Sequence, residues 1–226
     1  MVITLGLGEP EAGPRRVVLL SDLVPLITAG RPWPIGRPLI VAVDGRGAGG
    51  KTTLAERLLG LTPDAQVVHT DDIAWWHSRF GWEDLMISEV LEPLHRGESV
   101  HYQPPAWAAR KRSAHIDVSA DAPMVVVEGV GASRRELVGL IDAAIWVQSD
   151  FVEAERRGIL RDGGDDEAVQ GWHEWMAEEL PFLAADKPWE RADVIVGGSN
   201  QVDHDSEIEV VMATTLAGMD RANRPA

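Results

Sequence analysis

A glycine-rich turn between an apolar run and a helical pattern constrains this fold more than any other feature of the sequence. The stretch VDGRGAGGKTTLAERL, residues 43–58, overlaps the end of the apolar run PLIVAVDG. A continuous run of this kind is typical of a strand that is buried on both faces. Apolar residues then recur at helical spacing, at Leu54, Ala55, Leu58 and Leu59. The sequence therefore predicts a buried strand, a tight turn and a helix in direct succession.

The turn matches a phosphate-binding motif without a mismatch. Residues 45–52 read GRGAGGKT, which fits G-x-x-x-x-G-K-[ST] between a predicted strand and a predicted helix. Glycines let backbone N–H groups turn toward phosphate oxygens, and the following helix directs its positive end at the same anion. The lysine can reach the β- and γ-phosphates, and the threonine hydroxyl can hold Mg²⁺. The residues predicted to bind the nucleotide are Gly45, Arg46, Gly47, Ala48, Gly49, Gly50, Lys51, Thr52 and Thr53.

Strands and helices alternate along the rest of the chain, which indicates an α/β fold with helices on both faces of a parallel sheet. Further strands are predicted at 65–70, 124–129, 143–148 and 192–198, with a short pair at 99–104 and 114–118. Helices are predicted at 17–30, 83–97, 133–141, 150–162, 167–185 and 206–219. We expect one domain over 1–226, in which 1–37 form an N-terminal extension that packs on the core and 163–166 lie within a lid.

Composition excludes several classes of protein. The 226 residues carry a formal net charge of −15, which argues against a nucleic-acid partner because phosphate backbones need clustered Lys and Arg. There is no cysteine, so disulfides and zinc–thiolate sites are excluded, which fits a reducing cytoplasm. No apolar run approaches the ~18 residues of a membrane span, and the start lacks the features of a signal peptide. We expect a cytoplasmic protein, a monomer or homodimer, without a membrane partner.

Acidic residues follow two of the predicted strands. Asp71 and Asp72 come directly after the strand at 65–70, and Glu128 ends the strand at 124–129. Ligands of parallel sheets bind beyond the carboxyl ends of the strands. Asp71 could therefore accept the proton of an attacking hydroxyl, and Glu128 could help to hold Mg²⁺. The alternatives are a helix cap and an ordinary acid at a strand end. His69 we interpret as structural.

Arginines cluster just before the glycine pair at 163–164. Arg157 and Arg161 share one helix face by their i,i+4 spacing, so they are the candidates for neutralising a transferred phosphoryl group. The glycines would let this segment move. The alternative is a solvated helix face that pairs with neighbouring acids.

With these pieces the sequence resembles the uridine kinase/phosphoribulokinase group of P-loop small-molecule kinases over residues 38–200. The resembling segments are VDGRGAGGKTTLAERL, VVHTDDIAW, VLEPLHRGESV, VVVEGV, RRGILRD and ADVIV. The resemblance implies a three-layer P-loop NTPase fold with a five-stranded parallel core and a short lid, ATP as donor, and Mg²⁺. It also implies that Asp71 is the acceptor base, that Glu128 is the acidic residue after the third core strand, and that the lid arginines lie in RRGILRD.

The chain departs from that group around the acceptor. Uridine kinases have a Tyr-Asp…His-Ser-Arg segment about the nucleoside, where this chain reads YQPPAWAARKRS. Trp107 could replace the tyrosine and Arg110 the arginine, but the following Asp and His are missing. This weakens the case for uridine or cytidine as acceptor. Among nine tryptophans, Trp75 and Trp107 are our candidates for walls of the acceptor pocket, beside Asp71 and Asp72.

The sequence thus predicts an ATP-dependent kinase of a small hydroxylated metabolite, such as a nucleoside, sugar or vitamin-like alcohol. Two alternatives stay open. One is a nucleotide switch that hydrolyses without an acceptor, although the Asn-Lys-x-Asp signature typical of guanine-specific proteins is absent. The other is a regulator that binds nucleotide without transferring phosphate.

Overall fold

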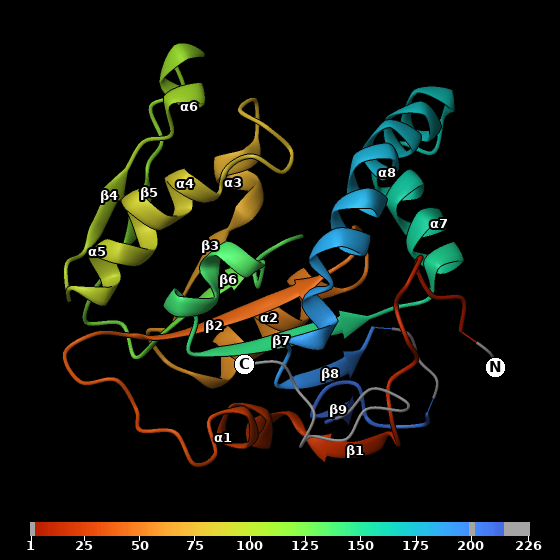
Figure 1. The fold of residues 1–226 in the computed structure, drawn as a ribbon, viewed down its shortest axis with the longest axis horizontal. Coiled ribbons are helices and arrows are strands. Elements are labelled where there is room, and N and C mark those ends of the chain that lie inside the picture. Colours follow the sequence, from red (N-terminus) through yellow and green to blue (C-terminus); the bar gives the residue numbers. More distant parts are fainter. Residues whose placement is uncertain (1–2, 199–201, 215–226) are drawn as a thin grey trace.

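A seven-stranded sheet forms the centre of the molecule (Figure 1). The computed structural model describes residues 3–198 and 202–214. The spatial strand order is β1-β9-β8-β7-β2-β6-β3, and a separate hairpin pairs β4 with β5. The strands are β1 (Arg16–Leu19), β2 (Leu39–Gly45), β3 (Gln66–His69), β4 (Val100–Tyr102), β5 (Ile116–Val118), β6 (Met124–Glu128), β7 (Ala143–Gln148), β8 (Val194–Gly197) and β9 (Glu209–Ala213).

Five neighbouring strands of this sheet are parallel, and two antiparallel strands extend it. β3, β6, β2, β7 and β8 form the parallel core that the sequence predicts. β9 pairs antiparallel with both β8 and β1. The α/β fold is therefore confirmed, but the expectation of a sheet with only five strands is wrong.

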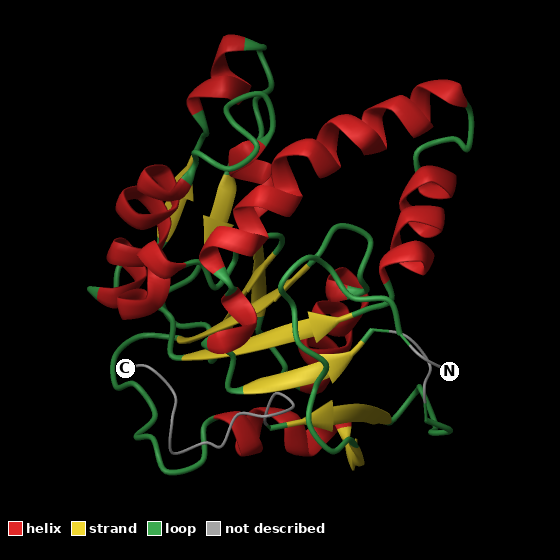
Figure 2. Ribbon diagram, turned by 45° about the vertical axis from the view of Figure 1, so that its right-hand side comes forward, coloured by secondary structure: helices red, strands yellow, loops and turns green. Residues whose placement is uncertain are grey.

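Helices cover both faces of the sheet (Figure 2). A helical segment over 83–95 consists of α4, a π-helical segment and α5, and the wide turn comes just before Pro93, which cannot donate a backbone hydrogen bond. The α-helices are α1 (Leu23–Ile27), α2 (Lys51–Leu61), α3 (Thr70–Ala74), α4 (Glu83–Met86), α5 (Glu92–His95), α6 (Pro105–Ala109), α7 (Phe151–Arg161) and α8 (Asp166–Asp186). Shorter helical segments are η1 (Leu20–Asp22), η2 (Ile87–Leu91), η3 (Arg135–Leu140) and η4 (Pro188–Glu190).

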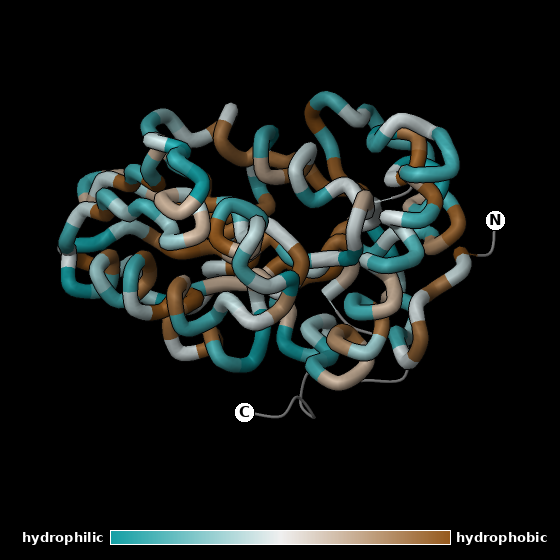
Figure 3. The backbone as a smooth tube through the Cα atoms, turned by 90° about the horizontal axis from the view of Figure 1, so that it is seen from above, coloured by the Kyte–Doolittle hydropathy of each residue, from teal (hydrophilic) through white to brown (hydrophobic). Residues whose placement is uncertain are grey.

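The core has one layer on each face of the sheet, because successive side chains of a strand point to opposite faces. Val41 and Val43 of β2 join the cluster that contains Leu54 and Leu58 of α2. Ile40 and its alternate neighbours join the second cluster, to which α4 and α5 contribute. Hydrophobic segments accordingly run through the middle of the molecule (Figure 3).

One predicted helix is wrong, and a second is confirmed only in part. Residues 206–219 are predicted as a helix, yet the described part contains β9, because Val210 and Val211 pair with Val18 and Val17 of β1; residues 215–219 lie outside the described part. The stretch 17–30 holds β1 and η1 before the short helix α1. In both places β-branched residues complete a sheet edge, and this tertiary pairing overrides the local helical pattern.

The helix predicted at 133–141 is a 3₁₀ segment, η3, over Arg135–Leu140, and no side chain caps its N-terminus, although Ser133 and Glu136 have the spacing of a capping box. The Ser133 hydroxyl instead donates to Asp44, at 2.8 Å, and Glu136 accepts from Arg134, at 2.9 Å. The side chains that would have capped a helix are therefore used to fix the loop after β6.

A helical hairpin stands beside the carboxyl end of the parallel strands. α7 leads through Asp162–Asp165 into α8, a long helix that descends toward the end of β2 (Figures 1 and 2). Gly158 of α7 lies against Trp172 of α8 so closely that an added Cβ would be 2.1 Å from the indole ring. The two helices are thus tightly packed, with the predicted lid glycines Gly163 and Gly164 at the turn between them.

Candidate functional site

The glycine-rich motif forms a tight loop between β2 and α2. Gly45, Ala48 and Gly50 have φ angles of +157°, +54° and +101°, so the backbone turns sharply at three places in this loop. The Lys51 Nζ donates to the carbonyl of Arg46, at 2.8 Å, so the lysine side chain folds back along the loop. This geometry is that of an anion-binding nest, at the N-terminus of a helix of 11 residues.

Asp44 anchors the start of this loop. Its fully buried carboxylate accepts backbone N–H bonds from Gly45, Gly131 and Ser133, at 2.7, 2.9 and 2.9 Å. Burial raises the pKa of Asp44, although these hydrogen bonds act against that rise. Asp44 therefore ties the phosphate loop to the loop after β6, a role that sequence reasoning did not assign.

Arg46, the second residue of the motif, is buried against the N-terminal segment of the chain. Arg46 forms an ion pair with Glu9, whose other carboxylate oxygen accepts from the Trp146 indole at 2.7 Å. The guanidinium also lies over the Phe151 ring, 5.4 Å from its centroid. Residues of the N-terminal extension thus contact the phosphate loop directly.

Glu128 links the loop to the end of β3. The Thr52 hydroxyl donates to Glu128 Oε1 at 3.2 Å, and His69 Nδ1 lies 2.7 Å from Oε2. Burial would raise the pKa of Glu128, but the His69 hydrogen bond and the charges of Lys51 and His69 lower it below its usual value. The same hydrogen bond raises the pKa of His69. His69, which the sequence indicates is structural, thus holds the Glu128 carboxylate, and its place at the strand end before TDD is the sequence signal for this contact.

Asp71 stands at the start of α3, close to the charged groups of the loop. Desolvation in this recess and the charge of Glu128 raise the pKa of Asp71, while Lys51, His69 and Arg161 act in the opposite direction. Asp71 is nevertheless a solvent-exposed residue, which limits this rise. The charges of Lys51, Glu128 and Arg161 therefore all act on the Asp71 carboxylate.

The two lid arginines have different surroundings. Arg161 forms an ion pair with Asp162 at 2.8 Å, and its positive charge also interacts with the negative charge of Asp71. Arg157 donates to the carbonyl of Gly198 at 3.4 Å, and its Nε and Nη2 atoms are buried without a hydrogen-bond partner. Because Gly198 lies beside Gly50, Arg157 faces the end of the phosphate loop rather than Asp71.

The predicted acceptor residues separate into an exposed group and a buried one. Trp75 is 57% exposed and meets Trp76 edge to face, with 5.9 Å between ring centroids. Arg110 lies over the Trp76 ring, 4.8 Å from its centroid. Trp107 is only 2% exposed and belongs to the core, with Arg112 stacked on it. Its burial argues against an acceptor contact and makes Trp76 a better aromatic candidate.

The loop region has oxygen donors suited to Mg²⁺. A threonine hydroxyl and a carboxylate at this distance are hard ligands, which Mg²⁺ combines with substrate phosphates and water. Within residues 3–198 and 202–214 no three His, Cys, Asp or Glu side chains group as a self-sufficient metal site. Thr52 and Glu128 therefore fit a magnesium ion that is completed by nucleotide phosphates.

Among the described helices none is long and apolar enough to cross a membrane.

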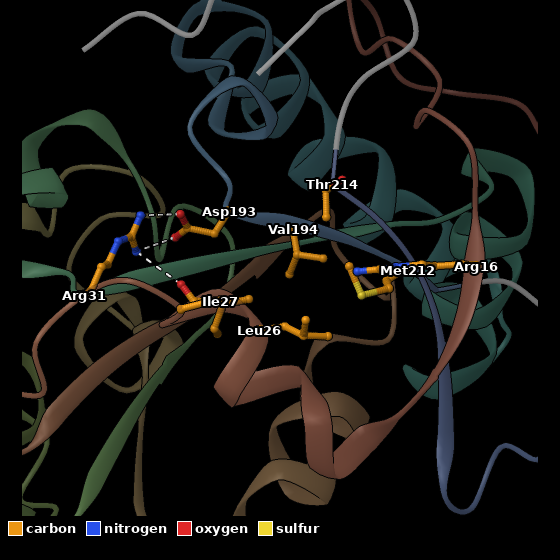
Figure 4. A pocket seen from close by; sticks show the side chains of 9 residues that line it. Arg16, Leu26, Ile27, Arg31, Asp193, Val194, Met212 and Thr214 are labelled. Atoms are coloured by element: carbon orange, nitrogen blue, oxygen red, sulfur yellow. Dashed lines mark hydrogen bonds and ion pairs between the residues drawn. The ribbon is translucent and has the colours of Figure 1, made fainter. Parts of the chain in front are cut away.

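A cavity of about 210 Å³ lies elsewhere, between α1 and the β8–β9–β1 edge of the sheet (Figure 4). Arg31 and Asp193 form an ion pair at its margin. Its lining residues are Arg16, Leu26, Ile27, Ala29, Arg31, Asp193, Val194, Met212 and Thr214. None of them belongs to the loop 45–52 or is another predicted site residue, so this cavity is separate from the candidate site.

Comparisons with known proteins support the fold. No protein-family model and no curated protein matches the sequence. A crystal structure described as a candidate fructose transport system kinase from Silicibacter sp. is 18% identical, with a TM-score of 0.56, over 77% of this chain and 96% of that chain. A candidate uridine kinase from Bacillus stearothermophilus is 17% identical, with a TM-score of 0.46, over 78% of this chain and 96% of that chain. The likeness to the structure from Silicibacter sp. confirms the predicted α/β fold.

Proposed function

We propose that this chain is an ATP-dependent phosphotransferase that moves the γ-phosphate to a hydroxyl of a small metabolite. The observation that carries the proposal is the link between the loop 45–52 and the end of β3, where Thr52 and His69 both contact Glu128. Asp71 follows His69 by two residues, at the start of α3. A phosphate loop alone would serve any nucleotide-binding protein. A carboxylate at the start of α3, on which the charges of Lys51 and Arg161 act, suits phosphoryl transfer to an alcohol.

The loop amides and Lys51 would hold the β- and γ-phosphates. Thr52 and Glu128 would hold Mg²⁺, which supplies charge neutralisation between the β- and γ-phosphates when it is bound. The His69 hydrogen bond keeps Glu128 ionised, and so keeps this carboxylate available as a ligand. Most of the catalytic effect would come from positioning and electrostatics.

Asp71 would accept the proton of the acceptor hydroxyl. As that proton moves to the carboxylate, the hydroxyl oxygen forms a bond to the γ-phosphorus, and the bond to the bridging oxygen of ADP breaks. Arg161, whose charge reaches Asp71, would offset the negative charge of the transferring group. The raised pKa of Asp71 makes its carboxylate a better proton acceptor than an ordinary aspartate.

The acceptor would bind beside α3. Trp75 and Trp76 present exposed rings there, and Arg110 adds a cation over Trp76. Aromatic faces suit a planar base or the apolar face of a sugar. The kinase description of the structural neighbour from Silicibacter sp. supports the reaction class without identifying the acceptor.

Coupled measurement of ADP release tests the proposal. The purified chain is supplied with MgATP and, in separate reactions, with nucleosides, sugars and vitamin-like alcohols. ADP release that requires one of these acceptors is the expected result. Hydrolysis of GTP at the same rate with and without acceptors would indicate a switch, and binding without turnover would indicate a regulator; either would contradict the proposal.

A further inference from the structure

A buried carboxylate from α8 contacts the phosphate loop. Glu179 is 0% exposed, and its two oxygens accept the backbone N–H of Gly47 at 3.1 and 3.0 Å. The Trp175 indole also donates to it. The Glu179 carboxylate is the acceptor in each of these hydrogen bonds, as expected of an ionised group that is held in place.

The contact leaves no space between α8 and the loop. A Cβ added at Gly47 would lie 2.9 Å from Glu179 Oε2 and 3.1 Å from the Trp175 indole nitrogen. The charges of Lys51 and Arg46 act on the same carboxylate. Burial raises its pKa, and these cations and hydrogen bonds oppose that rise. Glu179 thus has the backbone amide and the cationic surroundings that an incoming phosphate group would need.

α8 has features that would let this part of the helix shift. Pro181 lies inside the helix two residues after Glu179 and cannot donate to the carbonyl one turn earlier. At the other end, Gly163 and Gly164 form the turn from α7 with positive φ angles. The backbone of α8 therefore lacks one hydrogen bond beside Glu179, and the turn at its start has glycine conformations.

Residues that follow α3 contact α8 on the side where the proposed acceptor pocket lies. Phe80 packs against Trp175 and Phe182, with ring centroids 5.3 and 4.6 Å apart. Arg79 pairs with Glu178 at 2.7 Å. Residues next to the proposed acceptor pocket are consequently in contact with the helix that carries Glu179.

We propose that Glu179 is a latch that competes with nucleotide phosphate for the Gly47 amide, so that nucleotide binding displaces α8. The inference rests on the proposed nucleotide site. One backbone N–H cannot fully serve two anionic acceptors, and two negative charges at the same donor repel each other. When α8 moves away from the loop, its contacts with Phe80 and Arg79 change. Because these two residues lie next to the proposed acceptor pocket, binding of the nucleotide is coupled to the geometry of that pocket.

Isothermal titration with MgATP tests the latch in four proteins: the unchanged chain, Glu179→Gln, Trp175→Phe and the control Glu167→Gln. Glutamine keeps an acceptor for Gly47 but removes the charge; phenylalanine keeps the ring against Phe80 but removes the donor to Glu179. Glu167 lies on the exposed side of α8. Because glutamine removes the negative charge that competes with the phosphate for the Gly47 N–H, we expect Glu179→Gln to bind MgATP about tenfold more tightly.

The other outcomes separate the latch from the proposed function. We expect a smaller gain in Trp175→Phe and no change in Glu167→Gln. MgATP binding to Glu179→Gln that equals or falls below that of the unchanged chain would overturn the latch and make Glu179 a support of the loop. Absence of heat in all four proteins would overturn the proposed nucleotide site itself, and the latch with it.

Discussion

Arg46 of the phosphate loop forms a buried ion pair with Glu9, 37 residues earlier in the chain. Neither side chain has access to solvent beyond 3%. Thr4 extends the contact to the start of α7, because its N–H donates to Asp150 and its carbonyl accepts from Phe151, each at 2.8 Å. The N-terminal segment is therefore part of the support of the loop and of the helical hairpin beside it.

The Arg46–Glu9 pair predicts a strongly asymmetric response to mutation. We expect Glu9→Gln to lower the free energy of unfolding by about 3–5 kcal/mol, because it leaves the Arg46 charge buried without its partner. Replacing both residues, as Glu9→Gln with Arg46→Met, should recover most of that loss. Urea denaturation of the two variants checks this. A loss in the double variant as large as in Glu9→Gln would contradict the account.

The packing of α7 on α8 predicts opposite effects for two glycines. Gly158→Ala should destabilise the protein by about 1–3 kcal/mol, because its methyl group would collide with Trp172. Gly171→Ala on α8 is the matched control: nothing lies within 4 Å of its added Cβ, so alanine should stabilise the helix by about 0.5–1 kcal/mol. Thermal unfolding measures both. Equal melting temperatures would show that α7 and α8 are not packed as described.

The His69–Glu128 hydrogen bond predicts an effect on magnesium. His69→Ala should raise the Mg²⁺ concentration needed for half-maximal activity by about 10–100-fold, since groups that orient a metal ligand contribute on that scale. His69→Gln, which keeps a donor, should recover part of the affinity. The exposed His77 provides the control variant His77→Ala. An unchanged Mg²⁺ requirement in His69→Ala would separate Glu128 from the metal.

The proposed role of Asp71 as the general base predicts an effect on the rate of transfer and an effect on its pH dependence. Asp71→Asn should lower the rate of transfer by about 10²–10⁴-fold and leave MgATP affinity nearly unchanged, because the base acts on the acceptor. A general base must be deprotonated, so kcat/KM should fall as the pH decreases through the pKa of Asp71. Because that pKa is raised, the acid limb should lie above the ordinary aspartate value of 3.8.

Asp64→Asn, at an exposed turn, is the control for a loss of the same charge. Full transfer activity in Asp71→Asn, or a kcat/KM independent of pH on the acid side, would remove Asp71 from the role of base.

The sequence predicts the phosphate loop and the strand ends well because both depend on local signals. The motif at 45–52 fixes its own backbone through glycines and through the helix that follows. The apolar runs fix β2, β6 and β7, and parallel pairing then brings Glu128 and Asp71 to one edge of the sheet. Contacts within that edge follow from topology, which the alternation of strands and helices already indicates.

The remaining features depend on contacts between distant segments. β9 has a helical pattern and becomes a strand only because β1 and β8 offer it partners. Trp107 has the residue type of a pocket wall, but the hydrophobic cluster beneath α4 and α5 encloses it. Glu179 lies in the middle of a long helix without any motif, and only the descent of α8 onto the loop shows its contact with Gly47.

Calorimetric titration of MgATP into the unchanged chain and into Lys51→Ala tests the central claim most directly. We expect saturable binding of one nucleotide per chain, with loss of binding in Lys51→Ala, where the cation that reaches the phosphates is removed. Binding that is absent in the unchanged chain, or equally strong in Lys51→Ala, would contradict the assignment of residues 45–52 as the site of the nucleotide phosphates.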